Sequence, residues 1–180
     1  IADQITAHLA YASALIASDQ FQQASDILDR LPADHPETGY MRACLATKTQ
    51  RWPDVLTAVG VCTQNPRDVY LARAASLLEA WAAASLGLMQ PALQAAQRVI
   101  DGKPTPTDGL AARGARVNDV LTRDALFCRA LVLRHQSEDE ESESVLTGIR
   151  VQWPDFQRAQ VALNDRTFGL EVTDPETIAS

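Results

Sequence analysis

The stretch LAYASALIASDQFQQASDIL (residues 9–28) carries the clearest structural signal in the chain, because two helical patterns meet in it across a short polar break. Ala12 lies in the first pattern, and Ala24 and Leu28 belong to the second. Small and apolar residues spaced by three and four positions are typical of one face of an α-helix. A small residue such as Ala12 lets the first helix approach the second closely. The stretch therefore predicts a helical hairpin.

The same arrangement recurs three more times along the chain. The alanines equivalent to Ala12 are Ala43, Ala80 and Ala130, and the residues equivalent to Ala24 are Val55, Ala92 and Ser142. The bulky residue that precedes Ala24 by three positions, Phe21, recurs as Trp52 and Met89, whereas the fourth copy has Asp139. A helical hairpin repeated in this way is the tetratricopeptide (TPR) pattern, whose hairpins stack because none can bury its apolar face alone.

This repetition, in a chain that is rich in alanine and has only 6% aromatic residues, predicts an all-α fold. We expect a TPR-like superhelix of about four hairpins plus a final helix, followed by a short C-terminal extended segment. The expected helices are 2–18, 20–31, 36–50, 53–63, 67–87, 89–101, 117–136, 138–152 and 154–164.

The end of the chain departs from the repeat. Phe168, Leu170 and Val172 alternate with other residues, which predicts an extended segment. Asp174 and Pro175 then have the order of a helix start. We therefore expect a repeat domain at 1–164 and, at 165–180, an extended segment and the start of a linker helix toward a further domain.

Two local segments carry expectations of their own. Residues 102–116 (GKPTPTDGLAARGAR) are rich in Gly, Pro and Thr and predict a surface loop, either a connector or a partner-binding loop. Ser137 and Glu140 have the spacing of a capping box, in which each side chain bonds a backbone N–H at a helix start. Pro53 and Pro154 are expected at first helical positions.

The composition argues against several classes of protein. The formal net charge of −7 and the pI near 4.9 disfavour binding to nucleic acid or to anionic lipid, since both need a basic surface. No apolar run reaches the roughly 18 residues of a membrane-spanning helix, so we expect no membrane insertion. Cys44, Cys62 and Cys128 lack paired spacing and predict buried thiols in a reducing compartment.

The sequence contains no motif that would support catalysis. There is no phosphate-binding Walker loop, dinucleotide glycine fingerprint, zinc-protease histidine pair or nucleophile elbow. The three histidines are scattered over three hairpins. We therefore expect no enzymatic activity, cofactor or metal in this chain.

A stack of helical hairpins offers a groove instead, because its first helices line the concave side. Positions counted from the four alanines place these residues in it: Leu9, Tyr40, Lys48, Leu77, Trp81, Phe127 and Arg134. They predict an apolar and aromatic groove, edged by Lys48 and Arg134, for an amphipathic helix or an extended segment. In the alternative interpretation these side chains are covered by a neighbouring hairpin, by residues 165–173 or by further chain.

Four segments resemble the amino-terminal domain of the EccA family, the cytosolic AAA+ ATPases of type VII (ESX) secretion systems in mycobacteria and related actinobacteria. They are LAYASALIASDQFQQASDIL (9–28), TKTQRWPDVL (47–56), RALVLRHQSEDEESESVL (129–146) and above all ALNDRTFGLEVTDPETIAS (162–180). The resemblance implies a cytoplasmic protein-binding TPR domain that recognises secreted ESX proteins (Esx, PE/PPE or Esp-type) or their chaperones. It also implies that ATP and Mg bind in a separate carboxy-terminal domain, through which the parent protein forms a homohexamer.

A second hypothesis remains open at this point. The chain could be a generic TPR scaffold or the sensor domain of a regulator, whose groove binds an unrelated peptide or protein. A free-standing enzyme is the least favoured class, because the catalytic motifs are missing.

Overall fold

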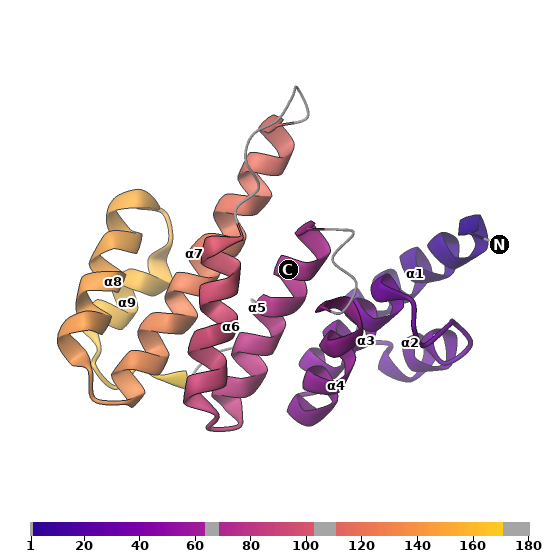
Figure 1. Cartoon of the computed structure of the whole chain (residues 1–180), viewed down its shortest axis with the longest axis horizontal. Helices are drawn as coiled ribbons and strands as arrows, with labels where there is room; N and C mark the ends of the chain where they lie inside the picture. The colour runs from indigo at the N-terminus through magenta and orange to yellow at the C-terminus, as the bar shows by residue number, and fades with distance from the viewer. Residues whose placement is uncertain (1, 64–68, 103–110, 171–180) are drawn as a thin grey trace.

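The computed structural model describes the backbone of residues 2–63, 69–102 and 111–170 (Figure 1). The helices in these ranges are α1 (Ala2–Ala17), α2 (Phe21–Leu28), α3 (Pro36–Lys48), α4 (Trp52–Thr63), α5 (Val69–Ser85), α6 (Met89–Asp101), α7 (Ala111–His135), α8 (Asp139–Gln152) and α9 (Gln157–Asn164). They pair as α1–α2, α3–α4, α5–α6 and α7–α8, and α9 packs on α8. The expected all-α fold of four hairpins and a final helix is confirmed.

Small residues form the contact inside each hairpin. Each of the following side chains has no exposed surface: Ala12 and Ala24, Ala43 and Val55, Ala80 and Ala92, and Ala130 and Ser142. In the fourth hairpin the Ser142 hydroxyl also donates a hydrogen bond of 2.8 Å to the Ala130 carbonyl. Complete burial at all eight positions confirms that the repeat read from the sequence is the packing repeat.

The four hairpin turns share one backbone geometry. The residue seven positions after each signature alanine adopts the left-handed conformation: Asp19 (φ 58°), Gln50 (φ 55°), Gly87 (φ 75°) and Ser137 (φ 65°). In each turn the next N–H bonds back to the first helix, as when Arg51 donates to the Ala46 carbonyl at 2.8 Å. This is the Schellman ending of a helix, which satisfies otherwise unpaired carbonyls.

This turn geometry overturns the predicted capping box. Ser137 is the left-handed turn residue, and Glu138 is the N-cap of α8, with no side-chain capping hydrogen bond. The Ser-x-x-Glu spacing is present, but the residue that ends α7 cannot also cap α8.

Two further expectations about local structure are corrected, and a third lies mostly outside the described ranges. Helix α7 begins at Ala111, so residues 111–116 are helical and not part of a loop, while 103–110 lie outside the described ranges. Pro154 lies in a turn before α9, whereas Pro53 is in the first turn of α4. After α9, residues 166–167 form a turn and no strand is present in 165–170; the rest of the expected extended segment and the expected linker helix, in 171–180, lie outside the described ranges.

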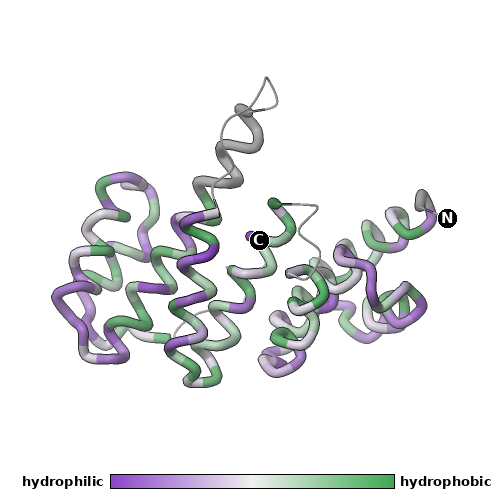
Figure 2. Tube along the Cα trace, in the orientation of Figure 1, coloured by the Kyte–Doolittle hydropathy of each residue, from purple (hydrophilic) through white to green (hydrophobic). Residues whose placement is uncertain are grey.

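Helix α5 is the centre of the array. It packs against α3, α4, α6 and α7, and its trace is hydrophobic over most of its length (Figure 2). A helix that is apolar on all sides is one that its neighbours surround. No helix of the described chain has the length and apolarity needed to cross a membrane.

The buried Arg73 links α5 to α6 and α7 through hydrogen bonds. Its Nε and Nη2 atoms donate to the Val99 carbonyl near the end of α6, at 3.0 and 2.8 Å, and Nη2 also donates to Thr122 Oγ1 on α7 at 3.1 Å. Burial lowers the pKa of this guanidinium. The carboxyl end of α6 carries partial negative charge, so it is a favourable place for the cation.

Gly39 lies at a tight contact between α3 and α4. A Cβ atom there would lie 3.0 Å from the Ala58 carbonyl oxygen and 3.1 Å from Val61 Cβ. We expect Gly39→Ala to lower the free energy of unfolding by about 1–3 kcal/mol through overpacking. Gly60→Ala, on the same helix pair but with nothing within 4 Å of its Cβ, should instead stabilise the protein by roughly 0.5–1 kcal/mol. Urea titrations of both variants measure the contrast, and equal effects would refute it.

The left-handed turns provide a second stability prediction. Gln50 carries a side chain where glycine is unstrained, so Gln50→Gly should raise the free energy of unfolding by about 0.5–1 kcal/mol. Gln94→Gly, at an exposed site inside α6, should lower it by a similar amount, about 0.5–1 kcal/mol. Thermal melts of the two variants must move in opposite directions.

Candidate protein-binding cleft

A cleft of about 510 Å³ opens where the first helices of the hairpins end. The residues that line it are Gln50, Trp52, Ala84, Ser85, Gly87, Met89, His135, Thr167, Gly169 and Leu170. They come from the α3–α4 turn, the α5–α6 turn, the end of α7 and the segment after α9. We call this the turn-edge cleft.

The turn-edge cleft is lined by both apolar and polar side chains. Trp52, Met89 and Leu170 are half-buried and give it apolar walls, while Ser85 and His135 are exposed at its rim. Apolar walls of this kind gain free energy by covering apolar side chains of a partner. The exposed hydroxyl and imidazole can hydrogen-bond to the partner backbone.

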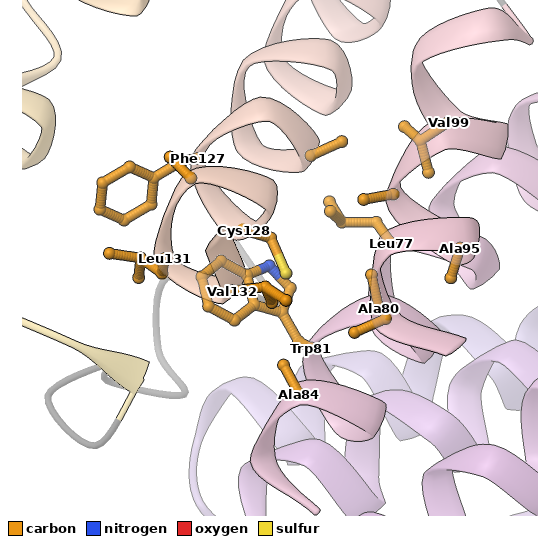
Figure 3. Packing of buried hydrophobic residues seen from close by; sticks show 14 of the residues in the cluster. Leu77, Ala80, Trp81, Ala84, Ala95, Val99, Phe127, Cys128, Leu131 and Val132 are labelled. Atoms are coloured by element: carbon orange, nitrogen blue, oxygen red, sulfur yellow. The ribbon is translucent and has the colours of Figure 1, made fainter. Parts of the chain in front are cut away.

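The sequence placed the centre of the groove elsewhere, and the structure corrects this. Leu77, Trp81 and Phe127 are 4%, 3% and 1% exposed, and they lie in the core between α5 and α7 (Figure 3). The Trp81 and Phe127 ring centroids are 6.4 Å apart. None of the three lines the turn-edge cleft. Leu9 is likewise buried, in the cluster between α1, α2 and α3.

Phe127 is covered by aromatic rings from the end of the chain. Its ring centroid lies 5.2 Å from that of Phe156 in an edge-on arrangement and 6.2 Å from that of Phe168. Both residues follow the fourth hairpin, one just before α9 and one just after it. Of the two interpretations left open by the sequence, the covered one therefore holds at this position.

The remaining predicted site residues are half-buried. Tyr40 and Lys48 lie on α3. The pKa of the Tyr40 hydroxyl is raised, mainly by burial and to a smaller extent by the neighbouring Cys44 thiol. Arg134 donates through Nη1 to the carbonyls of Ala162, Asp165 and Phe168 at 2.8, 3.4 and 3.3 Å. It therefore holds the segment after α9 instead of edging an open groove. Binding roles for Tyr40 and Lys48 stay predictions.

The three cysteines are buried and free, as the sequence predicts. Burial raises the pKa of Cys44 and of Cys62 to about 11, and it raises that of Cys128 as well. The thiols are thus neutral at pH 7 and act as small apolar side chains. Within the described side chains, no group of three or more His, Cys, Asp or Glu could hold a metal ion.

A second hollow, of about 520 Å³, lies between α2, α3 and α4. Its lining includes apolar residues such as Leu28 and Leu45, together with the charged Arg42 and Asp54. Arg42 donates to the Leu28 carbonyl at 2.9 Å. This hollow is formed by the two neighbouring hairpins α1–α2 and α3–α4, whereas the turn-edge cleft joins three hairpins.

Sequence reasoning missed most of the turn-edge cleft because its lining comes from hairpin turns. Gln50 and Gly87 do not belong to the apolar faces that define the repeat, and the bulky repeat residues Trp52 and Met89 were assigned to packing inside the hairpins. A usable signal was present, since a residue seven positions after each signature alanine must lie at the same edge. His135 and Ser85 also belong to the concave positions counted from the alanines.

The family described as "T7SS, ESX-1 secretion system protein EccA1, N-terminal domain" matches residues 1–180. The chain belongs to this family. It is 34% identical over 173 residues to the ESX-5 secretion system protein EccA5 of Mycobacterium marinum and of Mycobacterium tuberculosis, covering 94% of this chain and 26% of each relative. It is 27% identical over 174 residues to the ESX-3 protein EccA3 of Mycobacterium leprae, covering 92% and 25%. The chain thus spans about a quarter of the length of these relatives.

A solved structure has the same fold. The crystal structure of the N-terminal domain of the EccA1 ATPase from the ESX-1 system of Mycobacterium tuberculosis superposes with a TM-score of 0.70. The match covers 94% of this chain and 57% of that one, at 23% sequence identity. The EccA resemblance and the TPR-like architecture of this domain are confirmed.

The buried position of Trp81 in this EccA domain leads to a direct test. Trp81→Ala removes a core side chain beside Phe127, so we expect a loss of about 3–5 kcal/mol in the free energy of unfolding. Val151→Ala, at a position that is 75% exposed, should change it by less than about 0.5 kcal/mol. If chemical denaturation shows only a small change in the free energy of unfolding for Trp81→Ala, the conclusion that Trp81 is a core residue is wrong.

Proposed function

We propose that this chain is the protein-recognition domain of a type VII (ESX) secretion ATPase, and that it binds secreted ESX proteins or their chaperones in the cytosol. The observation that carries the proposal is the turn-edge cleft, which three hairpins line together in a domain of the EccA family. The parent protein binds ATP and Mg in a separate domain and assembles as a homohexamer through it.

The geometry of the turn-edge cleft supports binding of a protein segment. The walls that the hairpins contribute are fixed by the repeated Schellman turns and by the buried contacts behind them. A fixed surface loses little conformational entropy when a partner binds. The apolar side chains Trp52 and Met89 line the cleft from two different hairpins, so more than one partner residue can be buried against them.

The substitution Ser85→Arg tests this proposal. Ser85 is exposed at the end of α5 and lines the turn-edge cleft, so an arginine there fills the cleft without disturbing the core. We expect at least tenfold weaker binding of a secreted ESX protein or chaperone, which is about 1.4 kcal/mol. Isothermal titration of purified candidates from the same ESX locus measures it.

The matched control is Ser144→Arg, an exposed serine on α8 that does not line the turn-edge cleft. It should bind like the wild type. The proposal fails if no secreted ESX protein or chaperone from that locus binds the wild-type chain, or if the two arginine variants bind equally well.

A further inference from the structure

Residues 165–170, which we call the strap, lead from the end of α9 past α7 to the turn-edge cleft. Phe168 places its ring against Phe127, at a centroid distance of 6.2 Å. Two residues later, Leu170 lines the cleft together with Trp52 and Met89. Figure 1 shows the piece after α9 beside the end of α7 that leads into α8. The strap is therefore an apolar-x-apolar segment whose first apolar side chain packs on α7 and whose second lines the turn-edge cleft.

Arg134 holds the strap through backbone carbonyls, which a partner segment of any sequence could also provide. Its Nη1 donates to the carbonyls of Asp165 and Phe168, and to that of Ala162 in α9. Its Nη2 is buried and has no hydrogen-bond acceptor within the described part of the chain. A buried donor without an acceptor costs free energy, so the strap satisfies this guanidinium only in part.

The strap is held weakly for a segment that reaches the core. Phe168, Gly169 and Leu170 are half-buried, and the three residues before them are exposed. Two of its hydrogen bonds are internal, because Thr167 donates its N–H and its hydroxyl to Asp165 at 2.9 and 2.7 Å. The strap is also tied to α8 by an exposed ion pair, in which Arg166 Nη2 donates to Glu143 Oε1 at 3.0 Å. An exposed pair of this kind adds little free energy. The main attachments that a competing segment must replace are therefore the Phe168 ring contact and the Arg134 hydrogen bonds.

We propose that the strap is a built-in occupant of a binding site for an extended partner segment with an aromatic residue followed two positions later by leucine. The aromatic ring packs beside Phe127 and Phe156, whose rings already meet edge-on at 5.2 Å. The leucine enters the turn-edge cleft, and Arg134 binds the backbone carbonyls. A partner segment with an acceptor that also reaches Arg134 Nη2 makes a hydrogen bond that the strap does not make, and this favours the partner over the strap. This inference rests on the proposed protein-binding function of the cleft.

The test supplies the strap as a separate molecule. The probe is a capped synthetic hexapeptide with the sequence of residues 165–170, DRTFGL. The protein is the whole chain carrying Phe168→Ala and Leu170→Ala, which removes both anchors of the strap. The indole N–H signal of Trp52, which lines the cleft, is followed by NMR as peptide is added.

A tethered segment competes at a high effective concentration, so the wild type should resist the peptide. We expect a saturable Trp52 shift in the double variant, and at least about tenfold more peptide to be needed for the same shift in the wild type. Val151→Ala with Val161→Ala, two exposed sites outside the strap, should behave like the wild type. A peptide with alanine in place of its Phe and Leu should cause no shift.

Equal shifts in wild type and double variant, or none in either, would overturn the inference. If the double variant loses its helical circular dichroism, Leu170→Ala alone replaces it, and the wild type should then need at least about threefold more peptide. A concentration-dependent dimer of the wild type that disappears in the double variant would assign the site to a second copy of the chain, and would also overturn the inference.

Failure of this inference and failure of the proposed function give different results. Suppose that the strap substitutions enable peptide binding but that no secreted ESX protein or chaperone binds. This result supports the site and contradicts its assignment to secretion. Binding of a secretion protein that is blocked by Ser85→Arg but unaffected by the strap substitutions supports the function and contradicts the strap.

Discussion

The whole array depends on a fully buried pair inside each hairpin, in which an alanine of the first helix meets a small or β-branched residue of the second. At this point the two helices approach until their side chains have no exposed surface, as Ala12 and Ala24 show in the first hairpin. An isolated hairpin leaves the rest of its apolar surface in water, so stacking on the next hairpin supplies most of the stability. Alanine at the contact brings the helices together, and the larger residues around it fill the space between hairpins.

The same contact fixes where the turn-edge cleft lies. Each first helix ends at a left-handed residue seven positions after its signature alanine, so α3, α5 and α7 end at one edge of the array. The turns repeat in space because the contacts repeat. Trp52 and Met89, which begin second helices, are carried to the same edge and become walls of the cleft. The cleft is therefore a consequence of the repeat, although no single hairpin contains it.

The sequence predicts what depends on local spacing and fails where distant segments meet. The alanine pattern was enough for the hairpins and for most helix bounds, because a helix face is a local property. The exposure of Phe127 depends on Phe156 and Phe168, and its own helix gives no sign of either contact. Ser137 shows a further limit, since its capping spacing to Glu140 is local but the end of α7 determines its conformation. The sequence could have predicted that the hairpin turns share one edge of the array. It could not have predicted the cleft there, because its walls combine three hairpins with the strap.

The fourth hairpin is covered in a different way from the inner hairpins. An inner hairpin is covered by the next one, whereas the fourth hairpin is followed in the described chain by α9 and the strap. Here α9 takes part of that role with Ala159 and Ala162, which are fully buried, and Phe156 adds a ring over Phe127. The strap covers the remainder with half-buried side chains. Because α9 and Phe156 remain when the strap leaves, the fourth hairpin keeps most of its cover, and the surface beneath the strap can open without exposing the whole core.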